Sequence, residues 1–402
     1  TTVITRSEIE QSQSTDLKDL LQRQAGIDVA RGGGAGGQTA LFMRGTNSNH
    51  LLVLIDGLRV SDAGTGAFRW ELIDLSSVEQ VEIVRGPRAA QWGSDAIGGV
   101  IQIFTRQADG FQLTGTVGSF GEVGAGIAVG DGSQSINLST RDVEGFSAQN
   151  ARGFSFDPDK DGFENHQLSG RGVLKLPQGT LTWVGRWLDA MTEFDQGISD
   201  FSQMAGKLSY QTSVGAWQLT SEAGRYRNEL VTESAFGRTK SITRRTQLSV
   251  LGHRDITSQL QWMLGLDTVR EEGVNVGSWH ERRTHWSAWT SLQGGFNQFS
   301  YAASARVDDD DRFGRELSTQ LALRWQVNET LRSFVSVGEG FRSPNFSQLF
   351  SPGFDGLFAG NPLLQPEESL AYELGLDWTP LVGHQISMSG FDSKVNDLIS
   401  FT

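Results

Sequence analysis

The chain has 402 residues, a formal net charge of −13, 49 glycines, 8 prolines and no cysteine. The lack of cysteine excludes a disulfide framework, a zinc–thiolate site and a cysteine nucleophile. The negative charge argues against nucleic acid as a partner, because phosphate binding needs a basic stripe. Many glycines with few prolines are typical of a protein with many strands and tight turns.

The first 107 residues have a mixed pattern that predicts a small α+β globule. Residues 15–24 read as a short helix in which Thr15 is the N-cap and three leucines form an apolar stripe. A glycine-rich stretch, GGGAGG, occupies residues 32–37. Compact strands are predicted at 39–45, 51–57, 78–86 and 98–106.

From residue 108 onward, apolar residues recur at every second position. In 370–378, Tyr372 and Trp378 share the apolar face, while Glu373 lies on the other. Trp183 and Trp262 fall on similar apolar faces, and Arg306 falls on a polar one. An apolar outer face with aromatic residues and a polar inner face are typical of a transmembrane β-barrel.

The connections between the predicted strands support the barrel. Tight turns such as 177–179 and 294–297 alternate with predicted long loops at 143–166, 227–240 and 341–368. Barrels have short turns at one rim and long loops at the other. A soluble β-sandwich or β-helix with one solvated face is the alternative that the pattern alone leaves open.

About 15 strands are predicted between Phe111 and Leu398. An odd number cannot close an antiparallel barrel neatly, and an unpaired edge is not tolerated in lipid. We therefore expect the barrel to be incomplete at the C-terminus, with an unpaired edge on the strand near residues 386–398.

Several motifs resemble the TonB-dependent outer-membrane receptors. They are RGPRAAQWGSDAIGGVIQIFTR (85–106), FMRGTNSNHLLVLIDGLRV (42–60) and EGFRSPNFSQLF (339–350). The resemblance implies a plug domain over 1–107 inside a barrel that begins at 108 and has 22 strands when complete. It implies a monomeric barrel in the lipid of a Gram-negative outer membrane, with transport powered through TonB and neither enzymatic activity nor a redox cofactor. It also implies a TonB box before Thr1 and roughly seven more strands after the last one here.

Within this family, the chain resembles the branch that takes up vitamin B12. The stretches QSTDLKDLLQRQAGIDV, RGTNSNHLLVLIDGLRV, FDPDKDGF and VNDLIS carry this likeness. The implied ligand is a corrinoid or another large metal chelate. A ferric-siderophore or haem receptor of the same family is the first alternative. A passive porin or adhesin barrel is the second, although a porin has no plug of about 105 residues.

The resemblance places substrate contacts on two loops at the apex of the plug. The first loop contains GGGAGG, flanked by Arg31 and Gln38. GGGAGG lacks the Gly-Lys-Ser/Thr ending of a phosphate-binding loop. The second loop runs from Val60 to Ala67 and contains the candidate contacts Ser61, Asp62 and Thr65.

An acidic stretch predicts a calcium site. Asp157, Asp159, Asp161 and Gly162 form a D-x-D-x-D-G pattern, and oxygen ligands of this kind suit calcium. It is not an EF-hand, because Leu168 stands where a ligating Glu is required. By resemblance, residues 193–200 supply two more ligands, Asp195 and Asp200.

Other clusters of ionisable residues are interpreted without a ligand. A solvated acidic turn is the alternative for the D-x-D-x-D-G stretch, and residues 308–311 (DDDD) are interpreted as a solvated loop. His280 and His285 lie five residues apart, so in a strand they point to opposite sides and do not form a metal site.

Overall fold

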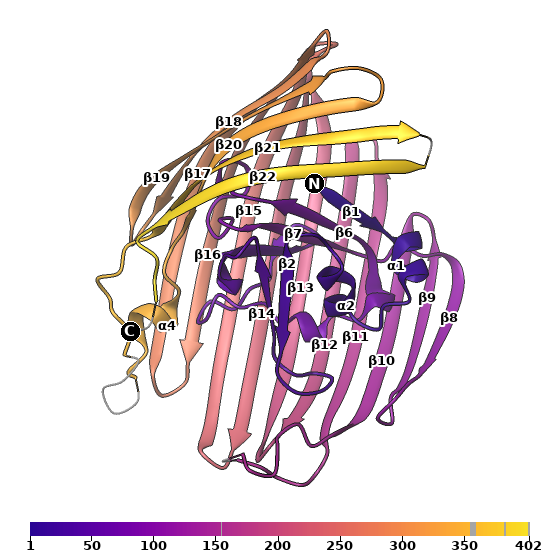
Figure 1. Cartoon of the computed structure of the whole chain (residues 1–402), viewed down its shortest axis with the longest axis vertical. Coiled ribbons are helices and arrows are strands. Elements are labelled where there is room, and N and C mark those ends of the chain that lie inside the picture. The colour runs from indigo at the N-terminus through magenta and orange to yellow at the C-terminus, as the bar shows by residue number, and fades with distance from the viewer. Residues whose placement is uncertain (154, 354–358, 382, 401–402) are drawn as a thin grey trace.

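The computed structural model describes all residues except 154, 354–358, 382 and 401–402. A small N-terminal globule lies against the concave side of a large curved antiparallel sheet, as Figure 1 shows in indigo against magenta to yellow. We call the globule the plug and the large sheet the wall. No helix among the described residues is long and apolar enough to cross a membrane.

The plug is built on a mixed sheet with strand order β1-β6-β7-β4-β5, in which β4 and β7 are parallel. Its strands are β1 (Thr2–Thr5), β4 (Leu51–Ile55), β5 (Leu58–Arg59), β6 (Val78–Arg85) and β7 (Gly99–Thr105), with a separate hairpin of β2 (Ile27–Arg31) and β3 (Thr39–Met43). Its helices are α1 (Arg6–Ser12), α2 (Leu17–Gln22) and α3 (Ala89–Trp92), and its 3-10 turns are η1 (Ser48–His50), η2 (Trp70–Leu72) and η3 (Leu75–Ser77).

The predicted helix near residue 15 exists, but its N-cap is wrong. The cap is Asp16, whose carboxylate accepts a hydrogen bond from the Asp19 backbone N–H, 2.9 Å away. Thr15 instead donates its hydroxyl to the Asp19 side chain. The leucine stripe is correct: Leu17, Leu20 and Leu21 are buried in the plug core.

The wall is a 15-stranded antiparallel sheet over the described residues, and each strand pairs with its neighbours in the chain. The strands are β8 (Asp109–Val117), β9 (Val123–Asp131), β10 (Gln134–Phe146), β11 (Asp161–Leu176), β12 (Gly179–Phe194), β13 (Gly197–Val214), β14 (Trp217–Ser234), β15 (Gly237–Thr257), β16 (Leu260–Asn275), β17 (Trp279–Phe296), β18 (Phe299–Asp310), β19 (Gly314–Gln326), β20 (Leu331–Arg342), β21 (Glu367–Leu381) and β22 (His384–Asn396). The two edges of this sheet are β8 and β22, so the edge expected near residues 386–398 is β22.

The predicted long loop at 227–240 is wrong. β14 continues to Ser234 and β15 begins at Gly237, so only two residues connect them. The part of the outward face that carries apolar residues, here called the apolar belt, ends before the tips of these strands. Beyond it both faces carry polar residues, so the alternation of hydrophobicity ends although β14 and β15 remain hydrogen-bonded to each other. The long connections at 147–160 and 343–366 do exist, and the second contains the helix α4 (Phe346–Phe350).

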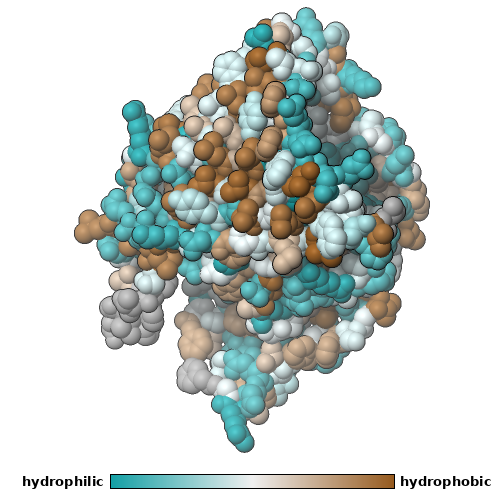
Figure 2. All heavy atoms as spheres, turned by 45° about the horizontal axis from the view of Figure 1, so that its top comes forward, coloured by the Kyte–Doolittle hydropathy of each residue, from teal (hydrophilic) through white to brown (hydrophobic). Residues whose placement is uncertain are grey.

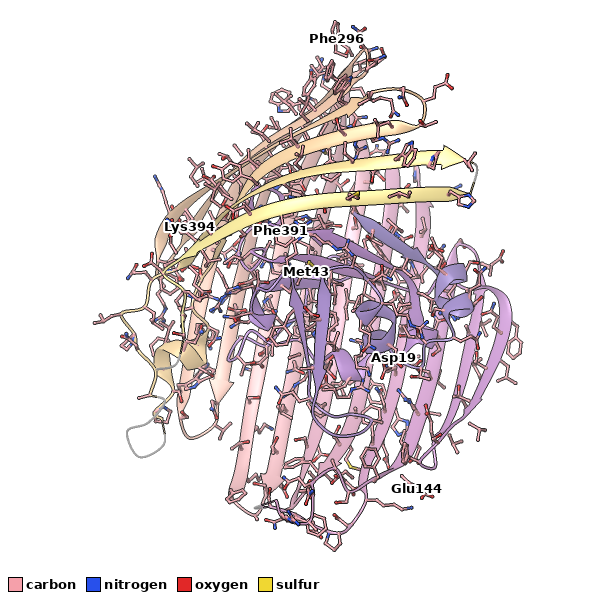
Figure 3. All side chains as sticks on the ribbon, viewed as in Figure 1. Asp19, Met43, Glu144, Phe296, Phe391 and Lys394 are labelled. Carbon is pink, nitrogen blue, oxygen red and sulfur yellow. The ribbon has the colours of Figure 1, made fainter. Side chains whose placement is uncertain are left out.

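The wall has the predicted inside and outside. Tyr372 and Trp378 are 54% and 46% exposed, whereas Arg306 is 3% exposed and Glu373 contacts the plug. Figure 2 shows large hydrophobic side chains at the surface. Figure 3 shows Phe391 of β22 beside the plug strand of Met43, and the Arg44 guanidinium lies 4.4 Å from the Phe391 ring.

A buried carboxyl group joins two parts of the plug. Glu71 of η2 is 4% exposed and accepts a hydrogen bond from the Thr39 backbone N–H of β3, 3.2 Å away. Its nearest positive charge is Arg69, at 3.5 Å. Burial raises the pKa of Glu71 to about 7. Sequence reasoning did not single out Glu71, because nothing in the local pattern marks it as buried.

If the outward face of the wall contacts lipid, a charged substitution there should lower the stability of the receptor more at the middle of the bilayer than near its surface. Leu266 lies on the outward face of β16 and is 63% exposed, so we expect Leu266→Arg to destabilise the full-length receptor by about 2–4 kcal/mol. Val276, in the turn after β16, is 58% exposed, and Val276→Arg should cost only about 0–1 kcal/mol. Urea titrations of folding into lipid vesicles measure both values. Equal costs at the two positions would contradict a lipid-facing wall.

The raised pKa of Glu71 predicts that stability falls as pH rises. Between about pH 4.5 and about pH 7 the unfolded chain ionises this carboxyl while the folded plug keeps it protonated, so folding is penalised progressively. The full loss is about 3 kcal/mol, and it levels off above about pH 7.

Heat unfolding of the full-length receptor at several pH values measures this loss. Glu71→Gln keeps an acceptor for the Thr39 N–H and should flatten the pH dependence. The partly exposed Glu82→Gln serves as the matched control and should leave it unchanged. An identical pH profile for wild type and Glu71→Gln would show that this carboxyl ionises freely in the fold.

Candidate functional site

A short ion pair joins the plug to the inner face of the wall. Arg44, which follows β3, contacts Glu373 of β21 with 2.5 Å between Nη2 and Oε1. Arg44 has φ +53° and the following Gly45 has φ +77°, so the chain reverses here and directs the guanidinium toward the wall. Both side chains are largely buried. The motif MRG in the sequence therefore supplies a contact between domains.

A second contact is fully buried and ties the plug to the long connection at 343–366. Glu367 is the first residue of β21, and its carboxylate accepts a hydrogen bond from Arg342 Nε at 2.5 Å. The same carboxylate oxygen lies 3.0 Å from His50 Nε2 of the plug. The other carboxylate oxygen accepts the Ile399 backbone N–H at 2.7 Å. Arg342 and Glu367 flank the connection at 343–366. Their ion pair therefore holds the two ends of the connection together, next to His50, the residue before β4 of the plug.

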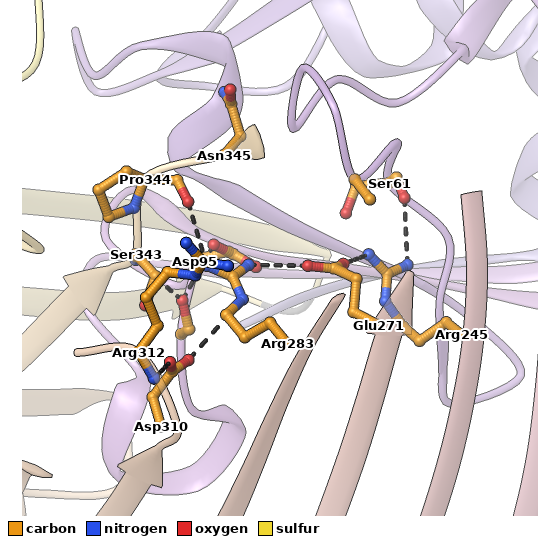
Figure 4. A network of polar contacts seen from close by, with 12 residues as sticks. Ser61, Asp95, Arg245, Glu271, Arg283, Asp310, Arg312, Ser343, Pro344 and Asn345 are labelled. Carbon is orange, nitrogen blue, oxygen red and sulfur yellow. Dashed lines mark hydrogen bonds and ion pairs between the residues drawn. The ribbon is translucent and has the colours of Figure 1, made fainter. Parts of the chain in front are cut away.

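A network of polar contacts joins the wall to the second apical loop (Figure 4). Glu271 of β16 lies between Arg245 of β15 and Arg283 of β17, with 2.7 Å to Arg283. Arg245 also donates to the backbone carbonyls of Arg59 and Ser61, at 3.0 and 3.1 Å. The wall therefore holds the main chain of this plug loop through arginines that are themselves neutralised.

The acidic run at 308–311 is not the solvated loop that was predicted. β18 extends to Asp310, and Asp308 is 4% exposed. Arg306 forms ion pairs with two carboxylates, that of Asp308 at 2.9 Å and that of Asp267 at 2.8 Å. Asp310 lies 3.7 Å from Arg283. Alternate positions of this strand face the lumen, so two of the four carboxylates meet arginines, of which Arg306 is buried and Arg283 is partly buried.

In the second apical loop, the predicted contact residues have different roles. Ser61 is buried, and Asp62 holds the loop together by accepting the Thr65 N–H at 2.8 Å and the Thr243 hydroxyl at 2.9 Å. The Thr65 side chain is exposed, while its carbonyl accepts Asn345 Nδ2 at 2.9 Å. Of the three residues, Thr65 is therefore the one that is exposed to a ligand.

In the first apical loop, too, only one of the predicted contact residues is exposed to a ligand, because the other already has a partner within the plug. Arg31 forms an ion pair with Asp16 at 2.7 Å, whereas Gln38 is exposed. Gly36 has φ +72°, and a Cβ there would lie 2.3 Å from the ring of Phe163 in β11. Only glycine permits this close approach of the loop to the wall.

The five predicted calcium ligands are brought together only in part. Asp161 accepts the Ala148 N–H at 2.7 Å, and Asp195 accepts the Asp157 N–H at 3.0 Å. Asp161 and Asp195 are both buried, and Asp161 interacts electrostatically with Asp195 and Asp159. Asp200 lies within β13 rather than in a loop and is exposed. No group of three or more His, Cys, Asp or Glu that could hold a metal occurs in the described part of the chain.

The motifs that carry His50 and Arg342 were noted in the sequence, but neither these residues nor Glu367 were assigned a role. His50 and Glu367 are separated by 317 positions, and local patterning carries no information about such a pair. His280 and His285 do lie on opposite faces: His280 contacts Glu272 on the outside, whereas His285 borders the internal network.

Comparisons with known proteins agree with this architecture. The family model described as TonB-dependent Receptor Plug Domain matches residues 1–100, and the one described as TonB dependent receptor-like, beta-barrel matches residues 101–402. The protein named Vitamin B12 transporter BtuB from Photobacterium profundum is 31% identical over 99% of this chain and 67% of its own length. The same-named protein from Vibrio vulnificus is 29% identical, with 99% and 67% covered.

Solved structures of similar fold include receptors for other ligands. The siderophore receptor PirA from Acinetobacter baumannii aligns with a TM-score of 0.81 at 16% identity, over 99% of this chain and 70% of that one. The hemophore receptor HasR from Serratia marcescens aligns with a TM-score of 0.80 at 15% identity, over 98% and 72%. The chain therefore belongs to the TonB-dependent receptors of the Gram-negative outer membrane.

Proposed function

We propose that residues 1–107 are the plug and residues 108–402 the barrel wall of a receptor that binds a corrinoid of the vitamin B12 type and imports it with energy from TonB. The observation that carries the proposal is likeness over nearly the whole chain to proteins named as vitamin B12 transporters, at 31% identity for one of them. The receptor performs no covalent chemistry. Its work is to bind the ligand at the plug apex and then to let the plug rearrange.

The charge balance beneath the apical loops supports a ligand with little net charge. Arg245 and Arg283 meet Glu271, and Arg306 meets Asp267 and Asp308. An anionic ferric siderophore would need arginines that keep their positive field free for the ligand. Here, the carboxylates between the guanidinium groups cancel much of that field.

The exposed apical residues also suit a corrinoid. The neutral Gln38 side chain offers both hydrogen-bond donors and an acceptor. The neutral Thr65 hydroxyl donates to Asp62 and accepts the Ala67 N–H, and it has one acceptor position left for a ligand. A corrinoid carries amide groups around its ring, which require such partners. We propose Gln38 and Thr65 as ligand contacts and assign Arg31, Ser61 and Asp62 to shaping the two loops that present them.

Direct binding measurements test the ligand. The full-length receptor should bind cyanocobalamin tightly and should bind ferric siderophores and haem at least about a hundredfold more weakly. Gln38→Ala and Thr65→Ala should each weaken cyanocobalamin binding by about 0.5–1.5 kcal/mol, the usual net worth of one hydrogen bond. Leu321→Ala, at an exposed position on the outward face of β19, is the control. A preference for a ferric siderophore or for haem would overturn the corrinoid assignment while leaving the family assignment intact.

We propose further that calcium binds the acidic connection through Asp157, Asp159, Asp161 and Asp195, with Asp200 as an additional ligand only after rearrangement. The support is the burial of Asp161 and Asp195 close to each other, with backbone N–H groups rather than cations as their hydrogen-bond partners. Lys160 contacts Glu144 and so points its charge away from the aspartates. Calcium takes 6–8 oxygen ligands, which this connection could supply together with backbone carbonyls and water.

Calcium and cyanocobalamin should then bind with positive linkage. Ordering the acidic connection with calcium removes an entropic cost from ligand binding, so we expect about 1–3 kcal/mol of coupling. Titrations of cyanocobalamin with calcium and with chelator measure this coupling. Asp161→Asn and Asp195→Asn should abolish it, whereas Asp200→Asn should have a smaller effect. Unchanged affinity in chelator would identify the stretch as a solvated acidic turn.

A further inference from the structure

A band of arginines crosses the outward face of the wall above its apolar belt. In the register of β14, β15 and β16, Arg225 pairs with Thr246, and Thr246 pairs with Arg270. In the next row toward the long connections, Arg227 pairs with Arg244, and Arg244 pairs with Glu272. Directly paired residues on neighbouring strands point to the same side, so each row shares one face of the sheet.

The alternation of burial shows which face this is. Tyr226 and Arg245 are 2% and 4% exposed and face the plug, whereas Arg225 and Arg227 beside Tyr226 are exposed. The band also includes Arg282 of β17, which pairs with Glu272 and is exposed. We call Arg225, Arg227, Arg244, Arg270 and Arg282 the arginine band.

The arginine band carries more positive charge than its acids neutralise. Arg227 contacts Glu229 at 2.8 Å, and Glu272 serves both Arg244 at 2.9 Å and Arg282 at 3.5 Å. Within the described residues, the guanidinium groups of Arg225 and Arg270 have neither an ion-pair nor a hydrogen-bond partner. Arg227 lies directly opposite Arg244, an arrangement of like charges that destabilises a sheet unless an anion joins them. In a chain of net charge −13, this local excess of positive charge offers a site for an anion.

The arginine band lies at the height of a membrane surface. Trp217, at the short-turn end of β14, is tilted against Trp262 with 5.4 Å between ring centroids, as in an interfacial aromatic girdle. Arg225 lies eight positions further along the strand, which corresponds to about 27 Å along it and about 20 Å in height at a tilt of ~40°. That matches the apolar band of about 25 Å in barrels of this kind. The end with long connections is the extracellular one.

An apolar hollow lies directly below the arginine band on the same face. Its lining includes Leu248, Val250, Leu266, Trp286 and Val307. It continues toward the short-turn end into a second hollow that shares Val250 and Leu266. The two together form an apolar groove whose lining reaches Leu248 and Thr268, each two residues short of the row that contains Thr246 and Arg270. A soluble anion would use only the charges, whereas an acylated anion would occupy both parts.

We propose that the arginine band and this groove bind one phosphorylated, acylated lipid of the extracellular leaflet, with phosphates between Arg225 and Arg270 and an acyl chain along Val250 and Leu266. Arg225 and Arg270 stand two strand spacings apart, about 10 Å between their backbones, so a ligand with more than one anionic group is best suited to reach both. Each guanidinium fork matches a phosphate in a bidentate manner. The inference rests on membership of an outer-membrane family and not on the identity of the transported ligand.

The test uses the delipidated full-length receptor in non-ionic detergent and counts bound lipid by native mass spectrometry. The probes are diphosphorylated lipid A, its monophosphorylated form, phosphatidylethanolamine and inorganic phosphate. We expect the affinity to fall in that order of lipids. The double variant Arg225→Gln/Arg270→Gln should lose at least about tenfold in affinity for the diphosphorylated probe. Arg225→Lys/Arg270→Lys should retain part of it.

Arg254→Gln is the matched control, because Arg254 lies at the other end of β15, on the same face and beside Trp217. It should leave lipid binding unchanged. Unfolding midpoints of all variants show whether the wall is intact, and the lysine variant keeps the test informative if the glutamine variant does not fold. Equal binding of all lipids, or no effect of the double variant, would reduce the arginine band to a solvated surface. Full competition by inorganic phosphate at equal affinity would mean a free-anion site and would also overturn the proposal.

Discussion

Burial of charge between the plug and the wall is the constraint on which the rest of this structure depends. A buried ion without a partner costs several kcal/mol, so the charged groups in this region need partners of opposite charge or hydrogen-bond acceptors. Arg44 of the plug meets Glu373 of the wall, and His50 of the plug meets Glu367. These partners come from different domains, so the two domains fit each other only in one register. The pairs fix position more than they add stability, because desolvation offsets much of their attraction.

The contrast with the plug's own interior explains how such a receptor can be both closed and mobile. The main apolar cluster of the plug is made almost entirely of its own residues, and Tyr226 is the fully buried contribution from the wall. The contacts across the boundary are instead polar and charged, and a small cavity lined by Arg59, Asp95 and Glu271 lies among them. Polar contacts can be replaced by contacts with water at a low net cost in free energy, whereas exposing an apolar core to water is strongly unfavourable. The plug can therefore shift as a body without losing its core.

The sequence was sufficient for the architecture because period-two alternation is a local signal. The outward positions of Tyr372 and Trp378 and the open edge at β22 follow from it directly. The same signal failed where strands leave the apolar belt: residues 227–240 were predicted to be a loop, although the strands continue on both sides of a two-residue turn. Strand hydrogen bonding does not require hydrophobic alternation, which only reflects the medium on each side.

The candidate site was predicted less well, because its contacts are long-range. Asp308 and Asp310 look like a solvated run until Arg283 of β17, which lies near Asp310, and Asp267 of β16, which shares Arg306 with Asp308, are known. Asp62 resembles a ligand contact in the sequence, yet it closes its own loop and receives Thr243. The sequence identified the apical loops correctly as segments but could not separate residues that shape a loop from those that it exposes.

The position of β1 at the edge of the plug sheet determines how the plug responds to tension. β1 pairs with β6 alone, through four residue pairs from Thr2↔Ile83 to Thr5↔Gln80, and Arg85 donates to the Thr2 hydroxyl at 2.7 Å. A force on Thr1 directed along the strand loads all of these hydrogen bonds in shear, so they resist together. A force directed away from β6 loads them one after another, and the strand peels off at far lower tension. The same strand is thus a strong anchor or a zipper depending on the angle of pull, and that angle decides whether a pull from TonB moves the plug as one piece or unravels it from this edge.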